Sequence, residues 1–322
     1  MSVRRIWTRW LAVALLGIAG AGSLLGCAPD DSAPAYRNQL ASGVTGGIYA
    51  EYGTALATVL SHELGTEILP VSTDGSLENL RLVGAGEAVM GFAQSDTAAD
   101  AIAGTGPFDE PLPIQAMARL YEEYVHVVVR ADSDVSELAN LPGHTISLGA
   151  PNSGVAAASA RILHAAAVDP TSITNPELGL DDSLAALRSG KIEGFFWVGG
   201  LPTPGLQALS RDVPIRLVSI DQKLVERLNA EFGGVYRIAE FPAGLYGRDE
   251  VTVTMTVPNY LIVAAHAPDS LVHDALAAVF RMRAEVAAEA PTAALLDRRL
   301  AIFTAPLELH PGAAAYYRDT KF

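Results

Sequence analysis

A stretch of small residues between a predicted strand and a predicted helix constrains the fold of this chain more than any other feature. It spans residues 40–49 and contains Gly43, Gly46 and Gly47, and an extended run over residues 36–40 precedes it. Backbone N–H groups at such a helix start carry a partial positive charge that suits an anion. An ordinary helix cap after a flexible turn is the equally weighted alternative. The glycine spacing fits neither a P-loop nor the dinucleotide fingerprint.

Strands and helices alternate along the next part of the chain. Residues 67–71 and 88–93 are predicted strands, each followed by a helix after a short connection. This order predicts a parallel sheet, in which ligands bind beyond the carboxyl ends of the strands. Thr45, Ser76 and Gln94 fall at or near those ends. Ser76 can equally be a helix cap, whereas Gln94 has no capping role, so a binding function is favoured there.

A second cycle of the same kind follows in the middle of the chain. Residues 145–148 form a predicted strand, residues 149–154 a small polar loop, and residues 155–167 a helix. Two copies of one α/β plan, each with a helix start that suits an anion, predict two lobes facing one cleft. Residues 125–130, 251–257 and 260–264 are predicted to be extended, and residues 270–288 to form an amphipathic helix. Residues 193–198 form a further strand that leads into a loop rich in glycine and proline. Trp197 in this strand is either a core residue or an aromatic wall of the cleft.

The N-terminal residues resemble a bacterial export signal. Residues 1–26 combine an arginine-containing start with an uncharged apolar run too short for a comfortable membrane span. The run ends in Leu-Leu-Gly before Cys27, the only cysteine, which matches a lipobox whose cysteine is lipidated. Residues 27–35 are predicted to form a tether. We therefore expect an extracytoplasmic protein anchored to a membrane through a lipid on Cys27.

Charge and motif content exclude several classes of protein. The chain has 22 basic and 36 acidic residues, and three of the basic ones lie in the predicted signal. The resulting excess of negative charge argues against nucleic-acid binding and against electrostatic attachment to anionic lipid. The seven histidines are scattered without metal-ligand spacing, and the sequence has no Gly-x-Ser-x-Gly elbow. We expect neither an enzyme nor a cofactor or metal.

Seven short motifs are spread in order over nearly the whole mature chain. They are Thr45-Gly46-Gly47-x-Tyr49, Gly75-Ser76-x-Glu78-Asn79, Gln94-Ser95-Asp96, Leu120-Tyr121-x-Glu123-Tyr124-x-His126, Gly149-Ala150-Pro151-x-Ser153-Gly154, Phe196-Trp197-Val198-Gly199-Gly200 and His310-Pro311-Gly312. As an ordered set they resemble the TAXI family of TRAP-transporter solute receptors. One departure is Val44, where a small polar residue is more usual in that family.

The resemblance implies an α/β fold of the periplasmic-binding-protein type II, with two α/β lobes around a ligand cleft and hinge crossings between them. The implied first lobe comprises residues 36–127 and 258–322, and the second comprises residues 128–257. The hinge crossings are expected near residues 125–130 and 251–261. The family also implies TRAP membrane subunits as partners, which use an ion gradient for uptake. An extracytoplasmic sensor that binds a similar solute and signals through a histidine kinase is the alternative.

The matching positions and their loop neighbours form the predicted ligand site. These residues are Thr45, Gly46, Gly47, Tyr49, Ser76, Asn79, Gln94, Tyr121, Asn152, Ser153, Gly154, Trp197, Gly199, Thr203 and His310. The candidate loops contain no arginine, so a carboxylate is expected to bind to the backbone N–H groups of the two glycine loops. The resemblance makes glutamate, 2-oxoglutarate or a related small carboxylate the expected ligand.

Overall fold

The computed structural model describes residues 37–320. The predicted signal over residues 1–26, the tether over residues 27–35 and the lipidation site Cys27 lie outside the described residues. The strands are β1 (Gln39–Ala41), β2 (Leu69–Val71), β3 (Met90–Gln94), β4 (Ile114–Arg130), β5 (Ile146–Ser147), β6 (Gly194–Gly199), β7 (Ile215–Leu217), β8 (Arg237–Phe241) and β9 (Thr252–Ala264). The helices are α1 (Ile48–Leu64), α2 (Ser76–Gly84), α3 (Ser95–Ala103), α4 (Gly154–Ala165), α5 (Leu180–Arg188), α6 (Pro204–Asp212), α7 (Gln222–Glu231), α8 (Asp269–Arg281), α9 (Arg283–Glu289) and α10 (Pro311–Asp319).

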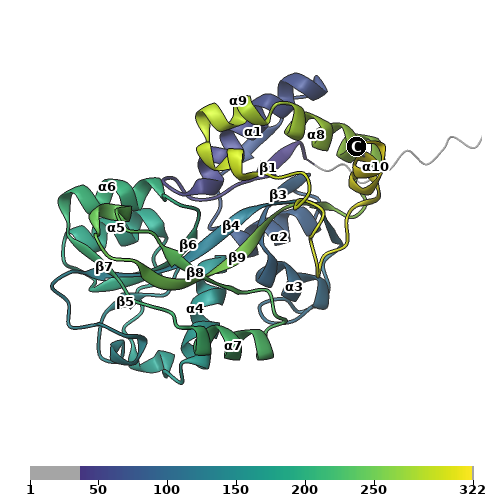
Figure 1. The fold of residues 1–322 in the computed structure, drawn as a ribbon. Helices are drawn as coiled ribbons and strands as arrows, with labels where there is room; N and C mark the ends of the chain where they lie inside the picture. The colour runs from purple at the N-terminus through teal and green to yellow at the C-terminus, as the bar shows by residue number, and fades with distance from the viewer. Residues whose placement is uncertain (1–36, 321–322) are drawn as a thin grey trace, which may run out of the picture. The chain divides into compact units, whose positions relative to one another are not determined.

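All the strands join one mixed sheet, in the order β2-β1-β3-β9-β4-β6-β5, with β7 beside β4 and β8 beside β9. Strand β1 is parallel to β2 and β3, and β5 is parallel to β6. The parallel pairing predicted from each strand–helix cycle is therefore confirmed within each cycle. Strands β4 and β9 run antiparallel to each other and to their other neighbours in the sheet. They join the two parallel parts into one sheet (Figure 1).

The two central strands are longer than the sequence pattern predicts. Strand β4 begins at Ile114, although only residues 125–130 were expected to be extended, and its register against β9 shifts twice before Tyr121. Two apolar runs, over residues 251–257 and 260–264, proved to be the single strand β9. Pro258 lies inside it, opposite Glu122. A proline in a run normally argues against a central strand, and this explains why one strand was predicted as two.

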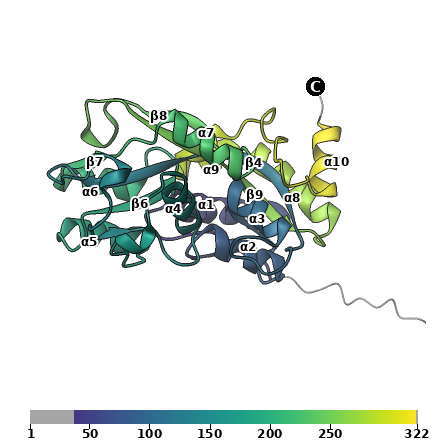
Figure 2. The same cartoon turned by 90° about the horizontal axis from the view of Figure 1, so that it is seen from below.

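Four hydrophobic clusters form the core. Two of them draw their buried residues from 40–121 and 260–316, and the other two from 125–257. In Figure 1, α1, α8 and α9 gather on one side of β1 and β3, while α2 and α3 lie on the other. Figure 2 shows α10 beside α8, with which it is in contact. This grouping differs from the predicted lobe boundaries only at the start of the second group, since Val125 and Val127 belong to the predicted first lobe. The division into lobes stays a prediction, because the described residues form one compact unit.

Helices α8 and α9 replace the one long amphipathic helix predicted over residues 270–288. The break lies at Met282, whose φ of −97° and ψ of 12° are not helical. Within residues 37–320, no helix combines the length and apolarity needed to cross a membrane.

Candidate functional site

A narrow cavity of about 30 Å³ lies where three helix starts and two strand ends converge. The helices are α1, α2 and α4, and the strands are β3 and β6. Eight predicted site residues line this cavity: Gly47, Tyr49, Ser76, Gln94, Ser153, Gly154, Trp197 and Gly199. The prediction drew these positions from segments far apart in the sequence, and the fold brings them together. This cavity is therefore the candidate ligand site.

Three other predicted residues do not line the cavity but form hydrogen bonds to the side chains and backbone next to it. The Tyr121 hydroxyl donates to Glu123 Oε1 at 3.1 Å. The Thr203 hydroxyl oxygen accepts a hydrogen bond from Trp197 Nε1 at 3.1 Å and so fixes the indole ring. Asn79 is completely buried, and its amide donates to the carbonyl oxygens of Ser42 at 2.7 Å and Phe92 at 2.9 Å. These residues position the lining and do not belong to it.

The remaining predicted residues contact other parts of the molecule. Thr45 and Gly46 face a separate surface hollow beside α9. Asn152 is exposed, and its side-chain oxygen accepts from Arg81 at 2.8 Å. His310 caps α10, and its Nδ1 accepts from the N–H of the residue two positions later at 3.1 Å. A ligand contact by these four residues stays a prediction.

The two glycine loops differ in how their helices are capped. The N–H of Gly47 donates to the Val44 carbonyl at 3.2 Å, and no side chain caps α1. At α4, Ser153 Oγ accepts from the Ala156 N–H at 3.1 Å, while the Ser153 N–H donates to a carbonyl of its own turn. Two of the N–H groups expected to hold a carboxylate are thus engaged within their own turns. In the first helical turns, the Ala156 N–H of α4 is also engaged, and the Glu78 N–H of α2 donates to the Asn152 carbonyl at 3.2 Å. The other first-turn N–H groups have no intrahelical acceptor and are the available donors.

Gly154 marks the closest approach across the cavity. A Cβ atom at this position would collide with Gln94 Oε1 and lie 2.9 Å from Ser76 Oγ. The start of α4 therefore packs directly on the end of β3 and the start of α2. Any larger residue must push these elements apart.

Glu123 on β4 lines the cavity and is absent from the predicted site, as are Asp74 and several apolar or glycine residues of the lining. It is 1% exposed, and its carboxyl oxygens accept from the Tyr121 hydroxyl and, at 3.2 Å, from the Tyr49 hydroxyl. Burial raises the pKa of Glu123 to about 8, and the hydrogen bonds from Gln94 and the two tyrosines oppose this rise only in part. The available signal was its place in the motif Tyr121-x-Glu123-Tyr124, a charge within a predominantly apolar strand.

Two buried side-chain acceptors near Glu123 have no hydrogen-bond donor among the described residues. Tyr49 accepts a hydrogen bond from the Asn259 amide, and its ring stacks on Phe92 with centroids 5.2 Å apart. Gln94 Oε1 and Asn259 Oδ1 are buried and accept no hydrogen bond from any residue between 37 and 320. No lysine, arginine or histidine is among the residues that line the cavity. Buried polar atoms are normally paired, so these two acceptors are open to a donor from outside the described residues.

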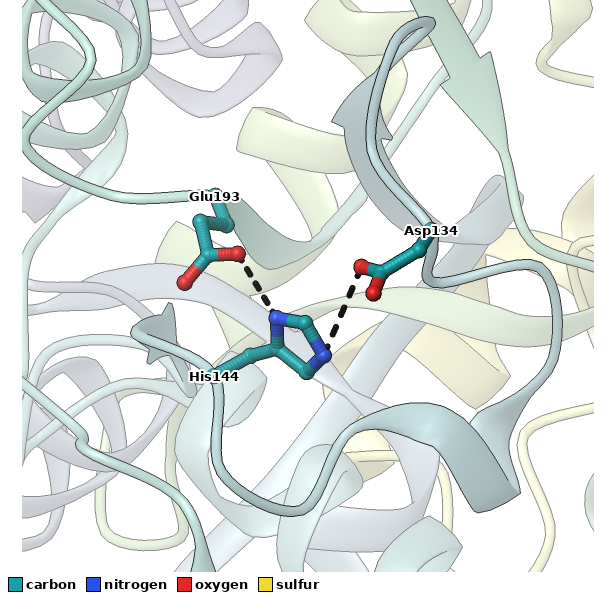
Figure 3. Close-up of side chains that lie close together, drawn as sticks. All are labelled: Asp134, His144 and Glu193. Atoms are coloured by element: carbon teal, nitrogen blue, oxygen red, sulfur yellow. Dashed lines mark hydrogen bonds and ion pairs between the residues drawn. The ribbon is translucent and has the colours of Figure 1, made fainter.

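A second polar cluster lies at the edge of the sheet, beside β5 and β6. Figure 3 shows His144 between Glu193 and Asp134, with distances of 2.6 Å from Nδ1 to Glu193 and 3.6 Å from Nε2 to Asp134. The ligand atoms of the three residues lie within 4.8 Å of one another, as in a metal-binding set. However, each imidazole nitrogen faces a carboxylate, and Glu193 also accepts from the Thr145 N–H at 3.1 Å. The cluster therefore joins the starts of β5 and β6 through the hydrogen bonds of Glu193 to His144 and to the Thr145 N–H.

The comparisons with known proteins identify the family. The model of the NMT1-like family matches residues 40–320. The chain belongs to this family. Among solved structures, MatC from Rhodopseudomonas palustris with bound malate has a TM-score of 0.55 and 16% identity, and the match covers 87% of this chain and 96% of MatC.

Two further solved structures are similar to this member of the NMT1-like family. The periplasmic aliphatic sulphonate binding protein SsuA from Escherichia coli has a TM-score of 0.45 and 15% identity, with 87% of this chain and 82% of SsuA covered. The GluR0 ligand-binding core from Nostoc punctiforme in complex with L-glutamate has a TM-score of 0.47 and 13% identity, with 78% and 98% covered. At such identities the likeness is one of fold. The match to MatC confirms the α/β periplasmic-binding-protein fold predicted from the sequence.

Proposed function

We propose that this protein is an extracytoplasmic solute receptor that captures a small carboxylate, such as glutamate or 2-oxoglutarate, for a TAXI-type TRAP transporter. The observation that carries the proposal is the convergence of the starts of α1, α2 and α4 on one cavity. Three helix starts give an anion site without a basic side chain. MatC, which shares the fold, holds malate, itself a small carboxylate.

The energies are sufficient for useful affinity. A helix start stabilises an anion by about 0.3–1 kcal/mol, and by up to about 2 kcal/mol when partly buried. A hydrogen bond to a charged group adds roughly 1.5–3 kcal/mol. Micromolar binding needs about 8 kcal/mol. Three helix starts and two or three such hydrogen bonds reach this value without an arginine.

The cavity of about 30 Å³ has room for only one or two water molecules, so the cleft is expected to open to admit a carboxylate and to close around it. Strands β4 and β9 pair from Ile114 opposite Ala264 to Tyr124 opposite Thr256, and they are the proposed hinge. Register shifts interrupt this pairing between Ala116 and Tyr121, and such irregularities let a strand pair bend. Small-angle scattering should show a smaller radius of gyration at saturation with ligand.

Calorimetric titration with a panel of small carboxylates tests the proposal directly. We expect micromolar binding of at least one of them, with little dependence on salt because buried dipoles are poorly screened. Absence of binding across the panel would overturn the proposed ligand class. For the TRAP assignment, uptake in membrane vesicles should require the receptor and should stop when the ion gradient is collapsed, not when ATP is removed.

The membrane anchor is tested through Cys27. The Cys27→Ser variant should be released from membranes or left unprocessed, because the lipid is proposed to attach to this thiol. If the variant fractionates with membranes like the wild type, the proposed anchor is wrong.

A further inference from the structure

The candidate cavity is lined by two chemically unlike sets of groups. The starts of α1, α2 and α4 offer N–H donors. Glu123 and Gln94 Oε1 are acceptors, and Gln94 Oε1 lies against the start of α4, where a Cβ at Gly154 would collide with it. A ligand that carries only carboxylates matches the first set and leaves the second unmatched.

The charged groups that face Glu123 give it no positive partner. Tyr49 on α1 and Tyr121 on β4 donate their hydroxyls to it. The next carboxylate, Asp96 on α3, raises the pKa of Glu123 further. The nearby cation, Arg161 on α4, is 2.8 Å from Asp96 and also pairs with another acid on α3.

The rest of the wall is negative or neutral. Asp74, which precedes α2, is the other acidic residue that lines the cavity, and the lining contains no basic side chain. A carboxylate that is 1% exposed and lacks a cation is strongly disfavoured in its charged form. The wall therefore favours a ligand that brings its own positive charge to Glu123.

We propose that the ligand carries a protonated amino group that pairs with Glu123, so that the receptor selects an amino acid over the corresponding 2-oxo acid. This inference rests on the proposed function, because the carboxylate of the amino acid occupies the helix starts. The ammonium group has three N–H donors. One of them can reach Glu123, and Gln94 Oε1 offers a second acceptor.

Binding is then linked to the release of a proton. Burial raises the pKa of Glu123 to about 8, so at pH 7 the group holds its proton while no cation is present. When the ammonium group arrives, the O–H bond of the acid breaks and its proton leaves to the buffer. The ammonium keeps its own protons and pairs with the carboxylate that remains. Each bound amino acid thus releases up to one proton.

Calorimetric titration of the full-length protein tests this at pH 7. The probes are L-glutamate with 2-oxoglutarate, L-alanine with pyruvate, and L-leucine with its 2-oxo acid, each in phosphate and in Tris buffer. We expect the best-bound amino acid to bind at least tenfold more tightly than its 2-oxo acid. Its apparent enthalpy should differ between the buffers, as release of a proton requires, and that of the 2-oxo acid should not.

Two variants complete the test. Glu123→Gln should lose at least tenfold in affinity for the amino acid and leave the affinity for the 2-oxo acid within a factor of three. Tyr121→Phe keeps the carboxylate and should retain the preference for the amine, which provides a result even if the first variant does not fold. Equal or tighter binding of the 2-oxo acids to the wild type overturns the inference and leaves the proposed function standing. Binding of none of the six probes overturns both.

Discussion

Two glutamates on neighbouring strands show how burial and hydrogen bonding compete. Glu123 on β4 and Glu193, directly before β6, each accept hydrogen bonds from more than one group. Burial raises the pKa of Glu123 to about 8, whereas the hydrogen bond from His144 lowers the pKa of Glu193. The side chain of Glu193 is 45% exposed, while Glu123 as a whole is 1% exposed. With donors similar in number, access to water decides the direction of the shift.

The two residues consequently have different uses. A carboxylate that water still reaches remains charged and strengthens local structure by a small amount. For a carboxyl group that is buried at a cavity wall without a cation, ionisation is unfavourable, and a cationic ligand that pairs with the group makes it favourable. Groups with such perturbed pKa values concentrate at functional sites. The following predictions sharpen or break this contrast.

The largest effect is expected from Glu123→Gln on the pH dependence of stability. The folded-state pKa of Glu123, about 8, lies above the ordinary value of 4.5. The native state then binds the proton more tightly than the unfolded state, so the free energy of unfolding falls as pH rises through this window. The slope from this one group is at most about 1.4 kcal/mol per pH unit. Glutamine cannot ionise and should remove this slope.

Urea denaturation of both proteins at pH 5, 6.5 and 8 measures this effect. The stability of the variant relative to the wild type should increase steadily with pH. Parallel curves for the two proteins would mean that Glu123 is not protonated in the native state, and the contrast with Glu193 would be lost.

Much of the cavity lining around Glu123 could be predicted from the sequence, but the burial of Glu123 itself could not. Ser76, Gln94 and Gly154 were predicted because a polar or glycine residue at a strand end or helix start has a local signature. The strand–loop–helix cycles around β1 and β5 were predicted for the same reason. Glu123 stands in one of the family motifs, but nothing local marks it as buried, since its burial depends on Tyr49 in another element and on the register of β4 against β9. Contacts between distant segments set this pKa, and periodicity does not record them.

Gly154→Ala should separate the walls that bury Glu123. The new Cβ would collide with Gln94 Oε1 and lie 2.9 Å from Ser76 Oγ. We expect about a hundredfold loss of affinity, equivalent to about 2.8 kcal/mol, and a pKa of Glu123 closer to the ordinary value because water enters. Gly179→Ala is the matched control, since its Cβ would meet only Val44, at 4.0 Å. Unchanged binding in the Gly154→Ala variant would show that the close packing of α4 on β3 and α2 does not affect ligand affinity.

Tyr121→Phe should weaken the hydrogen bonding of Glu123 without changing its burial. The Tyr121 hydroxyl donates to Glu123 Oε1 at 3.1 Å. A hydrogen bond to a charged group contributes roughly 1.5–3 kcal/mol and a neutral one about 1 kcal/mol. The variant should therefore lose more stability at pH 9 than at pH 6. Tyr317→Phe, which removes a hydroxyl that donates to the Met117 carbonyl at 3.2 Å, should lose the same amount at both. A loss in the Tyr121→Phe variant that is equal at pH 6 and pH 9, as in the control, would disprove the charge dependence.

The smallest effect is expected from Glu193→Gln, and its pH dependence has the opposite sign. The hydrogen bond from His144, at 2.6 Å, lowers the folded-state pKa of Glu193 below 4.5, so the charged form stabilises the native state above pH 4.5. This contribution disappears as pH falls through the lowered folded-state value. Because water and salt screen an exposed pair, we expect a loss below about 1 kcal/mol at pH 7 and a smaller loss at pH 3. Denaturation at both pH values with 0.05 and 0.5 M salt measures it, and a loss that is undiminished at pH 3 contradicts the ionic origin.

Ligand affinity should be unchanged, because Glu193 does not line the cavity. If Glu193→Gln instead weakened binding as much as Glu123→Gln does, the two carboxylates would share one role, and burial would not be what separates them.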